Sequence, residues 1–426
     1  MRHPPRPSIL VAFAVTCGLI APQPETMASA RAAPRPPAAI TVVTGIHAEQ
    51  IAIDAARGRV VVVGPIDAAG ADAGGTGVAI VDTNHRRLVA RIATTDAPIS
   101  LGLSERRALA YVVTGSVPST STLWTIDLRS GAVRRRTPLP FTVETAQPAI
   151  TLGVDDGTGH LFVVSAGSIV QDTLTMLSTE GAVLRTQPLP TKAGHLYIDP
   201  ARHRVVVASR TGPEVLGETP DGALVAFDTR SARRVWSASY AYPVVSITPD
   251  QVGHRLWTLA QGGRVSAVDI ATGRAVIVHP GYQVPADWRQ GPLVVDGVRS
   301  TAYVTWCAAG ACHLDAASAR THLRSTIAPL ATAQETLLGF VPDFTPFGVD
   351  TRRRQVLGSS LLDGRLSARD EQTGRYASTL TGPLPLEAIA VAQGVSHTDI
   401  AASVLTNQYS DTTGTTRTSA VTVLTR

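Results

Sequence analysis

Short apolar runs separated by turn residues recur along nearly the whole chain, and Val244–Pro280 shows the pattern most clearly. Gly262 and Gly263 predict a tight hairpin within this segment, because glycine readily adopts the positive φ angles of a primed turn. The apolar runs predict four strands, at Val244–Ile247, Arg255–Ala260, Arg264–Ile270 and Arg274–His279. The repeating unit is therefore predicted to be a four-stranded antiparallel sheet.

This unit recurs at a spacing typical of propeller blades, which take roughly 40–50 residues each. The predicted first strands begin near Gln50, Ala97, Ala149, Gly194, Val244, Leu293, Phe347 and Glu387. The second strands are continuous apolar runs, which indicates that neighbouring sheets cover both of their faces. We expect an all-β fold, a single β-propeller of four-stranded blades. Eight blades are favoured, and seven is the alternative if one weak copy is not a blade.

The last copy is one strand short of a blade. It offers strands at Ala388–Ala392, Ile400–Leu405 and Ala420–Leu424, while Ile40–Thr44 is a strand with no blade of its own. An unclosed ring would leave an exposed sheet edge. We therefore expect Ile40–Thr44 to complete the C-terminal blade as its outer strand.

Acidic residues occupy two fixed places in the unit, after the first strand and after the third. The first set is Asp54, Asp155, Asp199, Asp250, Asp296 and Asp350; the second is Asp82, Asp127, Asp228, Asp269, Asp315 and Asp370, with Ser178 replacing Asp in the third copy. Asp stabilises tight turns by accepting hydrogen bonds from the backbone that follows it. Recurrence in nearly every copy favours this turn role over a ligand role.

The chain carries a formal net charge of +5, and its basic residues are almost all arginines. They recur near the start of each fourth strand, Arg274 and Arg324 among them. This spacing predicts solvated charges around an outer rim. A nucleic-acid partner is not expected, because that function needs a contiguous basic face.

The first thirty residues are typical of a signal peptide. Arg2 and Arg6 precede the apolar run Ile9–Ile20, and Ala28-Ser29-Ala30 is an A-x-A cleavage site. We expect residues 1–30 to be removed by cleavage after Ala30, residues 31–39 to form a Pro/Ala linker, and residues 40–426 to form the propeller. The expected location is secreted or periplasmic, with no membrane span.

A lipoprotein anchor at Cys17 is the alternative to cleavage after Ala30. The residue before Cys17 is Thr16, where a lipoprotein signal requires a small residue such as Gly or Ala.

Two second strands carry a recognisable sequence. Tyr111-Val112-Val113-Thr114 and Tyr303-Val304-Thr305-Trp306, together with the Asp-x-x-Thr-Gly turn at Asp269–Gly273, resemble YVTN-type β-propeller repeat proteins. The resemblance extends from about Ile40 to the C-terminus. It implies an exported propeller, of a kind grouped with surface-layer propellers and with the propeller subunits of quinoprotein dehydrogenases.

No familiar catalytic pattern is present: the sequence has no G-x-S-x-G elbow, H-E-x-x-H, Walker A loop or complete G-x-G-x-x-G. His160, His203 and His254 precede second strands at corresponding places, which indicates a structural repeat. We therefore predict no catalytic residue, no metal ligand and no cofactor. The expected function is a non-enzymatic binding or scaffolding module, with an unknown protein or small molecule as its ligand.

Three other functions remain as alternatives. Ala226-Phe227-Asp228 followed by Trp236 resembles the docking motif of pyrroloquinoline-quinone propellers, in which the Trp joins neighbouring blades. This implies a quinone-cofactor dehydrogenase, although Ser231 and Ala232 replace the Thr-Gly of the motif and no two cysteines are adjacent. A lactonase-like hydrolase and a structural cell-envelope protein are the others.

Cys307 and Cys312 flank the tip between a second and a third strand. Facing hairpin positions lie within disulfide range, and export favours oxidation, so we predict a disulfide. A metal site that includes His313 is the alternative, but it lacks a fourth ligand.

The longest connections are the second-to-third-strand loops, Thr406–Ser419 among them, and the blade-to-blade connectors. These connections leave a propeller on one side, here named the loop face. Function concentrates in such loops. The candidate binding residues are Tyr282, Asp287, Trp288 and Arg289 in the connector Pro280–Gly291, with Phe344 and Phe347 from the next connector. Tyr, Trp and Arg dominate binding hot spots. The alternative is that Trp288 packs between two blades.

Overall fold

The structure is a computed structural model. It describes residues 38–67, 75–116, 120–142, 150–165, 172–189, 193–209, 222–240, 242–250, 252–279, 281, 289–308, 311–330, 344–360, 365–379, 386–393, 398–410 and 414–425. The chain divides into two units, Met1–Pro36 and Pro37–Arg426. The predicted signal peptide and most of the predicted linker lie outside the described residues.

The described part of the second unit consists of eight four-stranded antiparallel sheets, numbered here as blades 1 to 8 in chain order. Blades 1 to 4 are β2 (Gln50–Asp54), β3 (Arg59–Pro65), β4 (Thr76–Asp82) and β5 (Arg87–Thr94); β6 (Pro98–Ser104), β7 (Leu109–Thr114), β8 (Thr120–Asp127) and β9 (Val133–Thr142); β10 (Ile150–Val154), β11 (Leu161–Ser165), β12 (Thr173–Leu177) and β13 (Val183–Pro188); and β14 (Ala193–Asp199), β15 (Arg204–Ser209), β16 (Gly222–Asp228) and β17 (Arg234–Tyr240).

Blades 5 to 8 continue the series. They are β18 (Val244–Asp250), β19 (Arg255–Ala260), β20 (Arg264–Asp269) and β21 (Ala275–His279); β22 (Arg289–Asp296), β23 (Thr301–Ala308), β24 (Ala311–Ser318) and β25 (Arg324–Leu330); β26 (Thr345–Asp350), β27 (Gln355–Ser359), β28 (Leu366–Asp370) and β29 (Tyr376–Thr379); and β30 (Leu386–Gln393), β31 (Thr398–Ser410) and β32 (Gly414–Thr425) with β1 (Ala38–Val43).

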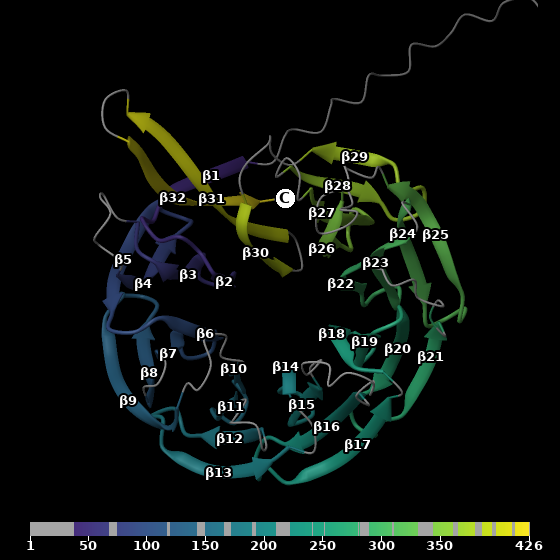
Figure 1. The fold of residues 1–426 in the computed structure, drawn as a ribbon, viewed down its shortest axis with the longest axis horizontal. Helices are drawn as coiled ribbons and strands as arrows, with labels where there is room; N and C mark the ends of the chain where they lie inside the picture. The colour runs from purple at the N-terminus through teal and green to yellow at the C-terminus, as the bar shows by residue number, and fades with distance from the viewer. Residues whose placement is uncertain are drawn as a thin grey trace, which may run out of the picture. The chain divides into compact units, whose positions relative to one another are not determined.

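Within this unit the blades follow one another around a ring, with the first strand of each blade innermost (Figure 1). The first strands of successive blades contact each other, and β2 contacts β30, which closes the ring. The predicted β-propeller is therefore confirmed, with eight blades among the described residues.

The closing strand is also confirmed. β1 pairs antiparallel with β32, from Ala38 opposite Thr425 to Val43 opposite Ala420, and it is the outer strand of blade 8. Beyond this pairing, β31 and β32 continue as a hairpin to Ser410 opposite Gly414, seen at the upper left of Figure 1. The stretch Thr406–Ser419 was expected to be a long loop, and this expectation was wrong, because all but its tip forms paired strands.

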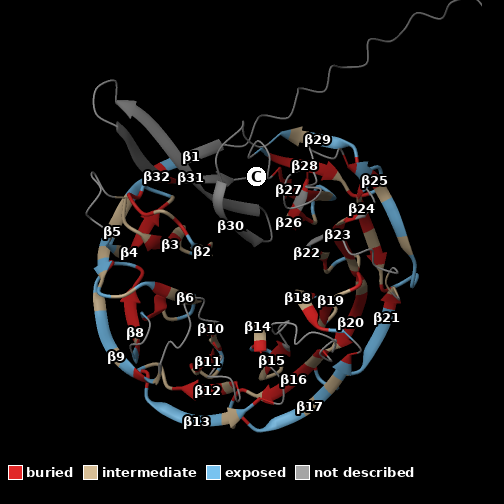
Figure 2. Ribbon diagram, viewed as in Figure 1, coloured by how far each residue is buried: buried red, intermediate tan, exposed pale blue. Residues whose placement is uncertain are grey.

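Apolar side chains fill the spaces between blades. Figure 2 shows the second and third strands as mainly buried and the outer strands as mainly exposed. Val61 and Val63 of blade 1, for example, form one cluster with Val112 and Trp124 of blade 2. The continuous apolar runs are buried on both faces, as the sequence pattern predicted.

The recurring aspartates at the end of the first strands are buried turn residues. Asp54 and Asp250 each accept a hydrogen bond from the backbone N–H three residues later, at 3.2 Å and 2.7 Å. The next position is left-handed, with φ of 54° at His203 and 55° at His254. The turn role is confirmed, and these two histidines are part of the turns.

Blade 6 departs from this scheme after its third strand. The Ser318 hydroxyl accepts hydrogen bonds from the N–H groups of Arg320 (3.2 Å) and Thr321 (3.3 Å). Asp269 accepts the corresponding bond from Thr272 at 2.8 Å. A serine hydroxyl thus fills the role of the turn carboxylate, and Asp315, which we expected at this turn, lies within β24 instead. That expectation was wrong.

Trp236 joins two blades. Its indole N–H in β17 donates to the Ile270 carbonyl of blade 5 at 2.9 Å. Gly273, with φ of 72°, lies beneath the ring, and a Cβ atom there would be 2.6 Å from the indole. This contact is the inter-blade role that the resemblance to quinone propellers implied for the residue.

Candidate binding site at the loop face

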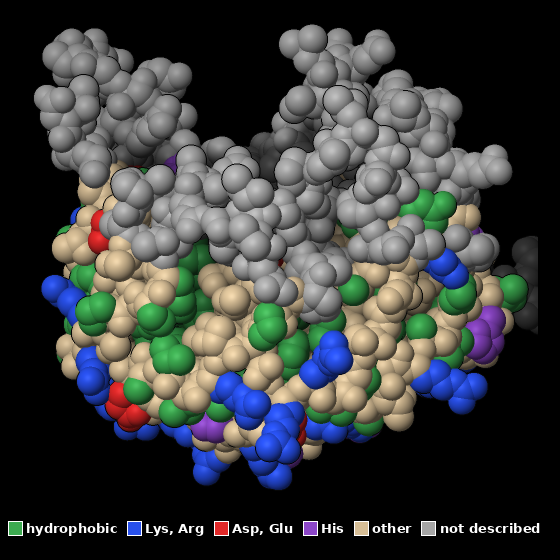
Figure 3. Space-filling view, turned by 60° about the horizontal axis from the view of Figure 1, so that its bottom comes forward, with side chains coloured by type: hydrophobic (Ala, Val, Ile, Leu, Met, Phe, Trp, Pro, Cys, Tyr) green, Lys and Arg blue, Asp and Glu red, His purple; other side chains and the backbone are tan. Residues whose placement is uncertain are grey.

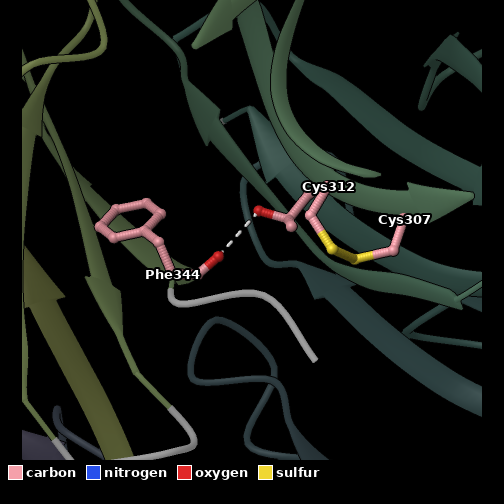
Figure 4. The surroundings of a disulfide bond; sticks show 4 residues. Cys307, Cys312 and Phe344 are labelled. Carbon is pink, nitrogen blue, oxygen red and sulfur yellow. Dashed lines mark hydrogen bonds between the residues drawn. A yellow bond between two sulfur atoms is a disulfide. The ribbon is translucent and has the colours of Figure 1, made fainter. Parts of the chain in front are cut away.

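A disulfide links the second and third strands of blade 6. Cys307 of β23 and Cys312 of β24 face each other across the strand pair, with Cα atoms 4.0 Å apart, and both are buried. Nearby, the Thr305 hydroxyl donates to the Phe344 carbonyl at 3.1 Å, the dashed line in Figure 4. The bridge therefore lies where blade 6 packs against blade 7.

Alkylation of the unfolded but unreduced protein is expected to modify neither Cys307 nor Cys312, because both sulfur atoms are in the bridge. Mass spectrometry of the peptide that contains both residues would test this, with a reduced sample as the control. Two alkylated thiols in the unreduced sample would rule the bridge out.

The structure describes three of the six predicted site residues, Arg289, Phe344 and Phe347. Tyr282, Asp287 and Trp288 lie outside the described residues. Arg289 begins β22 opposite Cys307, with its backbone alone described. Phe347 is half-buried in β26.

Phe344 has no exposed surface, so it belongs to the core rather than to an accessible binding face. Its ring packs against Gly358 of β27, where a side chain would occupy the same space, and the Arg369 guanidinium lies 5.0 Å from the ring centroid. Glycine at position 358 leaves room for the phenyl ring inside the blade.

A buried polar network lies at the end of blade 5, where the connector Pro280–Gly291, here called the candidate connector, begins. Arg324 of β25 donates from Nε to Asp315 at 2.7 Å, and the indole N–H of Trp306 donates to the same carboxylate oxygen at 2.7 Å. Arg324 also donates to the Gly263 carbonyl at 3.1 Å and to Nδ1 of His279 at 3.1 Å. Arg324 therefore links blade 6 to the last residue of β21.

The charge state of His279 follows from its partners. Both Arg324 and the Gly281 N–H (3.1 Å) donate to Nδ1, so this nitrogen is unprotonated. Burial, followed by the positive charge of Arg324, lowers the pKa of His279 from its usual value. The imidazole is thus neutral at pH 7, and it fixes Gly281 at the start of the candidate connector.

The network was not found from the sequence. Arg324 was expected among the solvated rim arginines, but its side chain is only 3% exposed, and that expectation was wrong for this residue. Trp306 stacks on His313 across the strand pair, with ring centroids 4.8 Å apart. One feature of the sequence could have indicated this arrangement. In blade 6 both Asp315 and Ser318 could have filled the turn position after the third strand, and a serine there leaves Asp315 available for another role.

On the face seen in Figure 3, the visible basic side chains stand as separate groups. Across the described ranges, no group of three or more His, Cys, Asp or Glu side chains is placed to hold a metal ion. The same residues include no helix with the length and apolar character needed to cross a membrane.

The fold defines the class: in the part of the chain that the structure describes, eight four-stranded sheets form a β-propeller. No family model matches it, and neither does any curated protein sequence. Among solved structures, BamB from Moraxella catarrhalis is similar with a TM-score of 0.55 and 14% identity, over 92% of this chain and 99% of that chain.

Two enzymes are similar in the same way. The quinohemoprotein alcohol dehydrogenase ADHIIG from Pseudomonas putida HK5 matches with a TM-score of 0.55 and 11% identity, over 92% of this chain and 76% of its own. A europium-containing methanol dehydrogenase matches with a TM-score of 0.53 and 10% identity, over 82% of this chain and 81% of its own. At these identities the likeness shows the fold alone.

Proposed function

We propose that this protein is an exported β-propeller that acts as a binding module, with a protein ligand at the loop face beside blades 5 and 6. One observation carries the proposal: the buried Asp315–Arg324–His279 network holds the start of the connector that contains Tyr282 and Trp288. A rigid base reduces the entropy that a binding loop loses when it meets its ligand.

The composition of the connector supports a protein ligand. Tyr, Trp and Arg are the residues most enriched in the hot spots of protein–protein interfaces, and Tyr282, Trp288 and Arg289 bring all three together within eight positions. The beginning of the connector is held by Arg324, and its end pairs with Cys307 beside the disulfide. Both ends are therefore attached to the packed part of the propeller.

Replacing Tyr282 and Trp288 together with alanine is expected to weaken capture of the partner at least about tenfold, since hot-spot residues contribute roughly 2 kcal/mol or more each. The measurement is retention of a partner protein from an envelope extract by the immobilised mature chain, quantified by mass spectrometry. The control is the double variant Tyr376→Ala/Leu323→Ala, which removes two exposed side chains elsewhere on the propeller.

Equal capture by the two double variants, or a loss confined to the control, would contradict the proposed site. If the mature chain retains no protein at all, the ligand is not a protein. Ultrafiltration with a small-molecule extract then becomes the test of the same loop.

The second candidate is a quinone-dependent dehydrogenase, which the inter-blade contact of Trp236 and the two similar dehydrogenase folds favour. The residues do not fit the quinone as the resemblance implies it. The sequence has no adjacent cysteines, and recurring aspartates such as Asp228 and Asp250 accept hydrogen bonds within their turns. Turnover of an alcohol with added quinone, calcium and a dye acceptor would overturn the binding-module proposal.

A further inference from the structure

In blades 2, 4, 5, 6 and 7, one position connects the two turns on the side opposite the loop face. It follows the turn residue at the end of the third strand, and its backbone N–H donates to a carbonyl in the first turn of the same blade. The bond is 2.9 Å from Leu128 to Ala108, 2.9 Å from Ala319 to Ser300 and 3.0 Å from Glu371 to Arg354.

The side chain at this position is buried in each of these blades. Leu128 of blade 2, Ile270 of blade 5 and Ala319 of blade 6 are apolar, and Thr229 of blade 4 is also fully buried. In blade 7 the residue is Glu371, which is 6% exposed. A carboxyl group thus occupies a place that other blades fill with Leu, Ile, Ala or Thr.

Blade 6 supplies most of the polar groups that face Glu371. The carboxyl of Asp296, at the end of β22, is fully buried, and its negative charge acts on Glu371. Arg299 forms an ion pair with Asp296, and its Nε lies 3.6 Å from Glu371 Oε2. Tyr303 of β23 also faces Glu371, and Arg354 of blade 7 adds a second positive charge. Among the described residues, Oε1 of Glu371 is buried and has no hydrogen-bond partner.

Arg299 also crosses between the blades, since it donates to the Thr351 carbonyl of blade 7 at 3.1 Å. Two carboxyl groups therefore meet one bridging guanidinium at the contact between blades 6 and 7. Two ionised carboxylates that share one guanidinium repel each other, and burying an ionised carboxylate is costly where one of its oxygens has no hydrogen-bond partner.

We propose that Glu371 is a proton-dependent latch between blades 6 and 7. When Glu371 is protonated, Asp296 is the only negative charge in the contact, and the Arg299 bridge is undisturbed. When Glu371 is ionised, a second negative charge faces Asp296 inside the contact, and the two blades are held less tightly.

The direction of the pH effect follows from the site. Burial and then the negative charge of Asp296 raise the pKa of Glu371 to about 7, from an ordinary value of 4.5. Because the pKa is higher in the folded state, the stabilisation is fully present below about pH 4.5 and is lost as the pH rises through about 7.

The test compares the thermal unfolding midpoint of the whole chain, between about pH 5 and about pH 8.5, with those of Glu371→Gln and Glu180→Gln. Glu180 is an exposed residue in the third-to-fourth-strand turn of blade 3, and a hydrogen bond from the Thr179 hydroxyl lowers the pKa of its carboxyl. The variant Glu180→Gln therefore removes the same charge from the surface of the protein. The wild-type midpoint is expected to fall by roughly 2–4 °C more than that of Glu371→Gln. The profile of Glu180→Gln should stay close to the wild type.

Hydrogen exchange locates the effect. Amides in Asp296–Tyr303 and Thr351–Arg354 should exchange faster above pH 7 in the wild type, after correction for the intrinsic rate, and not in Glu371→Gln. If Glu371→Gln does not fold, Glu371→Leu replaces it, since Leu occupies this position in blade 2. Parallel midpoint profiles for the wild type and the neutral variants, or exchange at the contact that does not depend on pH, would overturn the proposal.

Discussion

Deleting the chain through Thr44 is expected to lower the unfolding midpoint by about 10 °C, the shift that a loss of several kcal/mol causes in a domain of this size. The deletion removes β1, and with it the whole six-residue pairing to β32. It also removes buried side chains: Val42 packs in one cluster with Ile46 and Val60, and Thr44 has no exposed surface. The truncated propeller would expose the edge of β32.

The measurement is thermal unfolding followed by circular dichroism. The matched control begins at Ala38, so that it lacks only the residues before β1, and it should melt like the mature chain. If the chain that begins at Gly45 melted at the same temperature as this control, pairing between β1 and β32 would not be what closes the ring.

Asp315→Ala is expected to destabilise the protein by about 3–5 kcal/mol, the usual effect of removing one partner of a buried ion pair. Arg324 is 3% exposed, and the variant leaves its guanidinium between blades 5 and 6 without the carboxylate that faces it. Trp306 loses its hydrogen-bond acceptor at the same time. The urea midpoint should therefore fall while the slope of the transition stays unchanged.

Two further variants make this result specific. Asp269→Ala, which removes a turn carboxylate that accepts hydrogen bonds from Thr272, should lose only about 1 kcal/mol. Asp315→Leu/Arg324→Met, which removes both charges, should recover part of the stability, while the Trp306 N–H and the Gly263 carbonyl still lose their partners. If Asp315→Ala lost no more than Asp269→Ala, the ion pair would contribute little to joining the blades.

The parts of the fold that follow from local sequence could be predicted. Both Gly262 and Gly263 have positive φ, at 87° and 73°, as the two-glycine hairpin required. The missing strand of the last copy and the unassigned strand at Ile40–Thr44 together indicated the closure. These features depend on residues that are adjacent in sequence, or on the simple need to leave no sheet edge unpaired.

The candidate site depends on residues brought together from separate strands. His279, Asp315 and Arg324 come from β21, β24 and β25, and in the sequence each of them matches an ordinary position of the repeat. Phe344 is part of a connector, and its burial depends on Gly358 in the next strand pair. Because the copies of a repeat have similar sequences, the pattern does not distinguish blade 6, in which Asp315 and Arg324 form a buried ion pair, from blades in which the corresponding residues have other roles.

Blade 8 also determines the order in which the propeller can be completed. Its outer strand is made first and its other three strands are made last, so translation must reach β32 before β1 has a partner. Until then, β1 has no sheet to join, and β2 lacks its contact with β30 until β30 has been made. Ring closure is therefore a late event in biogenesis, and a nascent chain interrupted within blade 8 would have seven complete sheets and an open ring.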